Sequence, residues 1–321
     1  MTSIDVSVIV PAWKAMDFIE RSVKSALAST GVSLEVIVVD DASPDATFDA
    51  IKRLAAADSR VIADKLPVNG GPSAARNRAL GLAKGRYIAI LDADDGITAG
   101  RLASLVTLAD SSGADIVADN MMEVDEGGWA LGKRQPFLKS ADFTSKRGID
   151  LTTWVEHNHP MKSDECLGYL KPLFRRLKLI ETELRYDETL RNSEDYYLVA
   201  NLLAAGGRMI YAPEPGYLYQ RSSGSTSHRL QPAHTATWLD AERRFRAQHE
   251  AKLSAEEKGA LNVRGRALRD VHQFVAAVDA MKSKRIGAFF GLLASDLRAS
   301  AFTLTAFAKI AMGKALRRKL V

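Results

Sequence analysis

The chain has 321 residues, of which 46% are hydrophobic and 26% are charged, an ordinary composition for a globular protein. This length suffices for one large domain with an appendage or for two domains. The one cysteine, Cys166, excludes an internal disulfide and fits a reducing cytoplasm. The apolar run at 6–10 is too short for a signal peptide, and charges interrupt the apolar stretch at 286–315 before it reaches membrane-spanning length. We therefore expect a cytoplasmic protein.

The net charge of +5 is unevenly distributed along the chain. Residues 238–321 contain 17 Lys and Arg against 8 Asp and Glu, whereas residues 1–237 have a net charge of −4. The basic excess therefore belongs to the C-terminal region. Nucleic acid and an anionic membrane surface are both partners that such a region could bind.

Apolar runs and amphipathic stretches alternate along the first third of the chain. We expect strands at 6–10, 35–41, 61–62 and 88–91, and helices at 18–27, 46–57, 73–84 and 101–110. This alternation predicts an α/β fold with parallel strands joined by right-handed crossovers. Further strands are expected at 114–118 and 209–212, and the irregular segment at 126–146 is typical of a functional loop. From residue 238 onward the composition is helical.

Carboxylates directly follow two of the predicted strands. Asp92, Asp94 and Asp95 come after the strand at 88–91, and Asp41 closes the strand at 35–41. Asp92 and Asp94 point the same way in an extended chain, and the carboxyl ends of parallel strands form the ligand-binding edge of such a sheet. Hard oxygen ligands suit Mg²⁺ or Mn²⁺, which phosphate-handling sites hold with one or two carboxylates and the substrate's own phosphates. An acidic turn that caps the next helix would have the same sequence.

Four motifs narrow the choice of nucleotide-binding fold. They are Val-Ser-Val-Ile-Val-Pro-Ala-Trp at 6–13, Val-Val-Asp-Asp-Ala-Ser at 38–43, Asn-Gly-Gly-Pro-Ser-Ala-Ala-Arg-Asn at 69–77 and Leu-Asp-Ala-Asp-Asp at 91–95. Neither a Gly-x-Gly-x-x-Gly nor a Walker-type sequence occurs, which disfavours dinucleotide dehydrogenases and P-loop enzymes. In order and spacing, the four motifs resemble those of the family 2, GT-A-fold inverting glycosyltransferases.

The resemblance implies a fold and a division into domains. A GT-A domain, with a Rossmann-like, mostly parallel sheet and flanking helices, would occupy residues 1–235. Its nucleotide-sugar half would be 1–120 and its acceptor half 121–235. A helical, basic C-terminal region would follow at 236–321.

The resemblance also implies roles for residues of the nucleotide-sugar half. Pro11, Trp13 and Asp41 would contact the nucleobase, and Arg76 would face the nucleotide. Asp94 would hold Mg²⁺ or Mn²⁺, with Asp92 beside it on the ribose or the metal. A cap for the following helix is the alternative for Asp41, and an ordinary ion pair on a helix surface fits Arg76 equally well.

Two later segments carry further candidates. In Asn-Ser-Glu-Asp-Tyr-Tyr-Leu at 192–198, Ser193 could cap a helix whose first turn carries Glu194 and Asp195. The resemblance instead makes Asp195 the catalytic base. Arg221 would neutralise the diphosphate, or belong to a polar loop that leaves the domain. The segment 171–176 resembles one near an acceptor groove, and a solvated basic turn would have a similar sequence.

The function implied by the resemblance is transfer of a sugar from a UDP-sugar to a lipid-linked oligosaccharide, and glucose is the sugar expected. The setting would be bacterial exopolysaccharide assembly of the succinoglycan type, with no role for nucleic acid. A nucleotidyltransferase acting on a sugar phosphate and a non-catalytic nucleotide-sugar-binding relative are the alternatives. Asp195 counts against the second of these.

The end of the chain is amphipathic as well as basic. Apolar residues recur at helical spacing, and basic residues follow them, at Phe302, Leu304, Phe307, Ile310, Lys314, Arg317, Arg318 and Lys319. Such a helix could lie peripherally on the anionic inner face of the cell membrane. The same apolar stripe could instead dock on the catalytic domain or form an oligomer contact.

Overall fold

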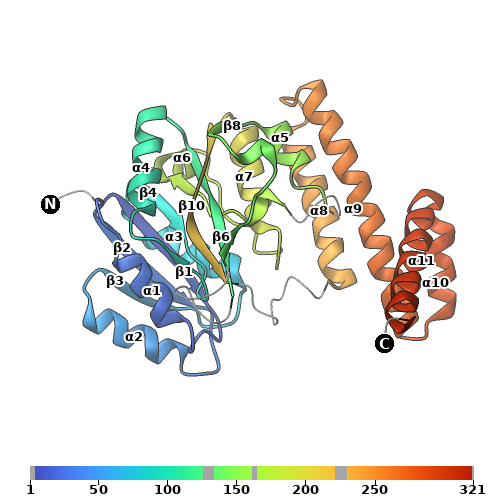
Figure 1. The fold of residues 1–321 in the computed structure, drawn as a ribbon, viewed down its shortest axis with the longest axis horizontal. Helices are drawn as coiled ribbons and strands as arrows, with labels where there is room; N and C mark the ends of the chain where they lie inside the picture. The colour runs from blue at the N-terminus through green and yellow to red at the C-terminus, as the bar shows by residue number, and fades with distance from the viewer. Residues whose placement is uncertain (1–3, 126–133, 161–164, 221–229, 320–321) are drawn as a thin grey trace. The chain divides into compact units, whose positions relative to one another are not determined.

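The computed structural model describes residues 4–125, 134–160, 165–220 and 230–319 (Figure 1). The chain divides into two compact units. The first unit comprises Met1–Asn158 and Glu165–Ser225, and the second comprises His159–Asp164 and Thr226–Val321. The domain boundaries expected from the sequence remain predictions.

The first unit is built around a sheet to which ten strands contribute among the described residues. They are β1 (Val6–Ala12), β2 (Leu34–Asp40), β3 (Val61–Lys65), β4 (Tyr87–Ile90), β5 (Gly96–Ile97), β6 (Ile116–Val124), β7 (Arg134–Pro136), β8 (Arg147–Ile149), β9 (Leu173–Arg175) and β10 (Met209–Gln220). Their order is β3-β2-β1-β4-β9-β6-β10-β5, with β7 paired to β6 and β8 paired to β10. Strands β1 to β4 are mutually parallel, as are β6 and β10, whereas β9 is antiparallel to both β4 and β6.

The central strands of the sheet are buried throughout their length, because helices cover the sheet. All residues of β2 and β4 are buried, which requires packing on both faces. The helices of this unit are α1 (Ile19–Leu27), α2 (Thr47–Ala57), α3 (Pro72–Leu82), α4 (Arg101–Ser112), α5 (Leu151–Glu156), α6 (Arg176–Glu181) and α7 (Glu194–Ala204), with 3-10 turns η1 (Ala141–Phe143) and η2 (Leu167–Tyr169). Helix α3 packs on β1 and β2, and α4 packs on β6 (Figure 1). The predicted α/β fold, a mostly parallel sheet with flanking helices, is confirmed.

Two elements differ from the sequence expectation. Strand β10 continues to Gln220, beyond the expected end at Ala212, because a register shift between Ala212 and Tyr217 accommodates the intervening prolines. Strand β9 lies in the segment for which a solvated basic turn was the alternative. Its Leu173 and Phe174 are buried, so that alternative is wrong.

The second unit consists of helices, as predicted for the C-terminal region. They are α8 (Pro232–His249), α9 (Ala255–Lys282), α10 (Ile286–Ser295) and α11 (Leu297–Lys319). A capping box formed by Ser254 and Glu257 begins α9, against which the other three helices pack. Within the described part of the chain, none of the helices combines the length and the hydropathy that crossing a membrane requires.

Candidate active site

Five chain segments meet at the carboxyl edge of the sheet. The parallel strands β1, β2 and β4 deliver the loops that begin at Trp13, Asp41 and Leu91 to this edge. Strand β9 runs in the opposite direction, with Leu173 opposite Ala89 of β4. The residues that precede β9 therefore reach the same edge, and Lys171 is among them. The N-terminal turn of α7 is bonded to this group through Asp195.

Lys171 connects the acidic loop after β4 to α7. Its Nζ lies 3.0 Å from Asp92 Oδ2 and 3.0 Å from Asp195 Oδ2. The two carboxylate oxygens are therefore separated by no more than the sum of these two distances. Burial alone would lower the pKa of Lys171, but Asp195 and Asp92 raise it above its ordinary value. The side chain is thus a permanently charged bridge between the two carboxylates.

Arg76 on α3 makes a second bridge between the same elements. Its Nη2 lies 2.9 Å from Asp92 Oδ1, and its Nη1 lies 2.6 Å from Glu194 Oε1 and 3.7 Å from Asp195 Oδ1. The residue is only 3% exposed, so it is not a surface arginine. Burial and the charge of Asp195 raise the pKa of Glu194, whereas Lys171 and Arg76 overcome burial and hold the pKa of Asp92 well below its ordinary value.

Asp94 is the carboxylate of this group that fits a metal ion. No described basic side chain lies within ion-pair distance of it, and burial, followed by the charge of Asp92, raises its pKa. In ionised form, Asp92, Asp94, Glu194 and Asp195 exceed the cations Arg76 and Lys171 by two negative charges. The described residues contain no group of three or more His, Cys, Asp and Glu side chains arranged as a complete metal site. A divalent cation at Asp94 and Asp92 would take its remaining ligands from a bound diphosphate or water.

Asp95 has a structural role. It is 1% exposed, accepts a 2.7 Å hydrogen bond from the Tyr217 hydroxyl on Oδ2, and accepts another of 2.8 Å from the Gln220 amide on Oδ1. Burial and then Asp94 and Asp92 raise its pKa well above the ordinary value. Asp95 thereby holds the acidic loop against β10 through both of its carboxylate oxygens.

The predicted nucleobase residues lie at the ends of β1 and β2. Trp13 is 49% exposed, with Lys14 Nζ 4.5 Å from its ring centroid, and Pro11 pairs with β2 inside the sheet. Asp41 accepts hydrogen bonds of 2.8, 2.7 and 2.8 Å from Asn69 Nδ2 and the amides of Gly70 and Gly71. Its carboxylate therefore braces the turn before α3 and does not cap α2.

Three non-glycine residues of the site have a left-handed backbone. Lys14 has φ 52°, Ala42 has φ 54° and Ser193 has φ 66°, and each is adjacent to a candidate residue. A side chain in this region costs roughly 1 to 2 kcal/mol. Ser193 immediately precedes α7 but its side chain does not cap the helix, whereas Glu194 and Asp195 do lie in the first helical turn, where acids are favourable. Strain of this kind persists where the surroundings enforce it, as at functional sites.

The structure thus brings Asp92, Asp94, Arg76 and Asp195 together at one edge. Arg221 lies outside the described residues. The sequence reasoning missed the role of Lys171, although it singled out the segment that starts there. A lysine directly before a short buried strand was the available signal.

Substitution of Arg76 by methionine is expected to lower the free energy of unfolding by about 3 to 5 kcal/mol, because it leaves the buried carboxylate of Glu194 without its cation. Urea denaturation at neutral pH measures this. Arg78→Met is the matched control: Arg78 is 53% exposed and pairs with Asp64, so its loss should cost less than about 1 kcal/mol. Equal effects of the two substitutions would contradict the bridging role.

The loss of stability caused by Arg76→Met is expected to depend on pH. The pKa of Asp92 is lower in the folded state than in the unfolded state. The ion pairs of Asp92 therefore stabilise the fold fully above the ordinary carboxyl pKa of about 4, and this stabilisation is lost as the pH falls below it. The stability difference between the native protein and Arg76→Met should therefore narrow in acid.

Comparisons with known proteins agree with this geometry. The model of the glycosyl transferase family 2 matches residues 7–178. The succinoglycan biosynthesis protein ExoO of Rhizobium meliloti is 36% identical over 282 residues, 88% of this chain and 79% of that protein. ExoU of the same organism is 34% identical over 297 residues, which cover 89% and 82% of the two chains.

Solved structures show the same fold. TarS 1–349 of S. aureus in complex with UDP-GlcNAc has a TM-score of 0.62 at 18% identity, covering 91% of both chains. The Pyrobaculum calidifontis mannosyltransferase PcManGT, in complex with GDP-Man and Mn²⁺, has a TM-score of 0.60 at 20% identity, covering 98% of this chain and 81% of that one. With a family model over more than half of its length and relatives above 30% identity over most of it, the chain belongs to the family 2 glycosyltransferases.

Proposed function

We propose that this glycosyltransferase moves a glucosyl residue from UDP-glucose, with inversion, to a lipid-linked oligosaccharide in bacterial exopolysaccharide assembly. The names of ExoO and ExoU, which refer to succinoglycan biosynthesis, support the setting. Donor and acceptor are supported by Escherichia coli WfaP, a UDP-Glc:alpha-D-GlcNAc-diphosphoundecaprenol beta-1,3-glucosyltransferase that is 47% identical over 90 residues, 28% of this chain.

The observation that carries the proposal is the Lys171 bridge. It keeps a carboxylate suited to proton abstraction, Asp195, within a few ångströms of the carboxylates suited to a metal–diphosphate group. An inverting transferase needs this arrangement, because the acceptor hydroxyl must be deprotonated next to the departing diphosphate. A site that only binds a nucleotide sugar would not need the base.

In the proposed reaction, Asp195 accepts the proton of the acceptor hydroxyl as its oxygen attacks the anomeric carbon on the face opposite the diphosphate. One displacement completes the transfer, and no covalent enzyme intermediate forms. Asp94, with Asp92, would hold Mg²⁺ or Mn²⁺, which when bound supplies charge stabilisation to the leaving diphosphate. Trp13, Pro11 and Asp41 would receive the nucleobase.

Arg221 would neutralise the leaving diphosphate through bidentate hydrogen bonds.

A donor panel tests the reaction. UDP-glucose, UDP-galactose, UDP-GlcNAc and GDP-mannose are each incubated with Mg²⁺ or Mn²⁺ and a polyprenyl-diphosphate-linked sugar, and the product's anomeric configuration is read by NMR. We expect transfer from UDP-glucose with inversion. Retained configuration would contradict the single displacement, and pyrophosphate release from a nucleoside triphosphate and a sugar phosphate would favour a nucleotidyltransferase.

We further propose that the second unit contacts the inner membrane surface peripherally, mainly through α10. Phe302 and Phe307, which the sequence assigned to such a contact, pack with Phe274 at centroid distances of 6.4 and 5.5 Å. Leu304 of the same stripe is 53% exposed, but α10 presents two apolar side chains that are more exposed, Ile286 at 69% and Phe290 at 62%. Exposed basic residues immediately precede them, at Lys282, Lys284 and Arg285. An apolar helix face beside basic residues favours anionic lipid surfaces.

Flotation with phosphatidylglycerol vesicles at low salt is expected to carry the native protein and to fail for an Ile286→Ser/Phe290→Ser variant. Each basic residue at the surface should add roughly 1 kcal/mol, so binding should weaken with salt. Val68→Ser/Leu177→Ser, which replaces two exposed apolar residues of the first unit, is the control and should float normally. A native protein that never floats would contradict the membrane contact. A change in molecular mass of the α10 variant, measured by light scattering, would indicate a subunit contact instead.

A further inference from the structure

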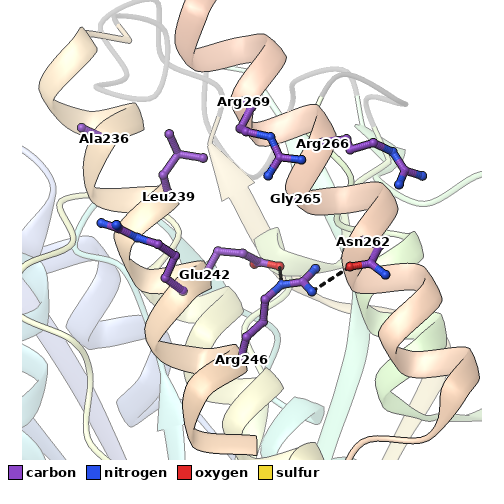
Figure 2. Close-up of a pocket in the computed structure, with 9 residues that line it drawn as sticks. Ala236, Leu239, Glu242, Arg246, Asn262, Gly265, Arg266 and Arg269 are labelled. Carbon is purple, nitrogen blue, oxygen red and sulfur yellow. Dashed lines mark hydrogen bonds and ion pairs between the residues drawn. The ribbon is translucent and has the colours of Figure 1, made fainter. Parts of the chain in front are cut away.

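A groove lined by arginines lies between α8 and α9 within the second unit (Figure 2). Its volume is about 560 Å³. It is lined by Ala236, Leu239, Glu242, Arg243, Arg246, Asn262, Gly265, Arg266 and Arg269. These residues are separate from the carboxylates of the first unit, and the glycosyl transfer assigns no role to them.

Helical spacing gathers the basic residues on two facing surfaces. Arg243 and Arg246 are three residues apart on α8, and Arg266 and Arg269 are three apart on α9, so each pair shares one helix face. Gly265 belongs to α9, and a Cβ there would lie 3.4 Å from Arg246 Nη2 on the facing helix. The absent side chain leaves room for the guanidinium groups to approach a common centre. Figure 2 shows Arg246 and Arg269 extending into the space between the helices.

The residues that line the groove carry more positive than negative charge, although Arg243 pairs with Asp240 and Arg246 with Glu242. Its only lining carboxylate, Glu242, is 4% exposed and already accepts hydrogen bonds from Arg264 and Arg246. Arg266 and Arg269 are exposed, and neither forms an ion pair with any described residue. Arg246 also donates a 2.9 Å hydrogen bond to Asn262, which fixes its guanidinium at the centre of the groove (Figure 2). The guanidinium of Arg269 on α9 and the anchored Arg246 on α8 therefore provide one cation from each helix for an anion, whereas Arg266 extends away from the space between the helices (Figure 2).

We propose that this groove binds a diphosphate group. Guanidinium forks pair in a bidentate manner with phosphate oxygens, and charge-assisted bonds from both walls would suit a ligand with two linked phosphates. A carboxylate would use only one fork. The proposal needs no divalent cation and no catalytic residue, so it can stand if the proposed donor is wrong. The bound group would be either the lipid-linked diphosphate of the acceptor or free diphosphate. The first of these rests on the proposed function.

Calorimetry with inorganic pyrophosphate in metal-free buffer tests the site. We expect binding to the native chain, and a rise in Kd of at least about tenfold in Arg266→Gln/Arg269→Gln, because a hydrogen bond to a charged group contributes that much or more. The control Arg244→Gln/Lys258→Gln removes two positive charges from the same two helices outside the groove and should leave Kd within about twofold. No binding to the native chain, or equal weakening in both variants, overturns the proposal.

Hydrogen exchange on the native chain gives a readout that needs no variant. Pyrophosphate should protect amides of residues 236–246 and 262–269, and protection confined to the first unit would overturn the assignment. A polyprenyl diphosphate in neutral detergent micelles distinguishes the sources. Binding tighter than that of pyrophosphate identifies the acceptor lipid as the ligand, and equal binding identifies free diphosphate. Failure to bind either compound overturns the site without affecting the glycosyl-transfer proposal.

Discussion

Replacement of Asp195 by asparagine is expected to slow sugar transfer by a factor of about 10² to 10⁴, the range for loss of a general base. Asparagine keeps the shape of the side chain, and its carbonyl oxygen can still accept a hydrogen bond from Lys171. Folding and donor binding should therefore survive. Steady-state transfer rates and UDP titration in the presence of metal measure the two effects separately.

The neighbouring acid supplies the matched control for this experiment. Glu194 also lies in the first turn of α7, but it bonds to Arg76 and is not bonded to Lys171. If the two acids only stabilised the start of the helix, Glu194→Gln and Asp195→Asn would have similar, small effects. A folded Asp195→Asn protein with near-native turnover would remove Asp195 from the role of base.

Asp94→Ala is expected to abolish metal-dependent binding of UDP. The diphosphate would then approach a group of carboxylates that Arg76 and Lys171 only partly neutralise, without a metal ion in between, and the anionic groups would repel each other. Calorimetric titration of UDP with Mg²⁺ or Mn²⁺ measures the loss directly.

Asp95→Asn is the control, because both carboxylate oxygens of this adjacent acid already accept hydrogen bonds, from Tyr217 and Gln220. It should lose stability and keep its UDP affinity. Unchanged UDP affinity in Asp94→Ala, with metal present, would contradict the assignment.

The sequence predicted the parallel half of the sheet well because the signals there are local. Continuous apolar runs define β1, β2 and β4, and the helices between them have clear periodicity. The carboxylates after β2 and β4 follow from the same reasoning, since parallel strands end at one edge. The observed boundaries of these strands and helices differ from the expected ones by a few residues only.

Lys171 and Arg76 could not be assigned in the same way. Strand β9 has three residues, and its position depends on antiparallel pairing with β4 and β6, which are far away in the sequence. Arg76 is on a helix, and no spacing rule shows that Glu194, 118 residues later, lies against it. Sequence patterns report neighbours along the chain, whereas this part of the site is assembled by tertiary contacts.

The left-handed residues around the site set a limit on engineering this protein for heat resistance. Glycine adopts positive φ without the steric cost that Ala42 incurs, so Ala42→Gly is among the first substitutions that a stabilisation screen would select. Yet Ala42 follows Asp41, and Lys14 and Ser193 adjoin Trp13 and Glu194. Relaxing these positions would loosen the loops that we propose to hold the donor and the base. Variants selected for melting temperature at these positions should therefore be screened for turnover at the same time.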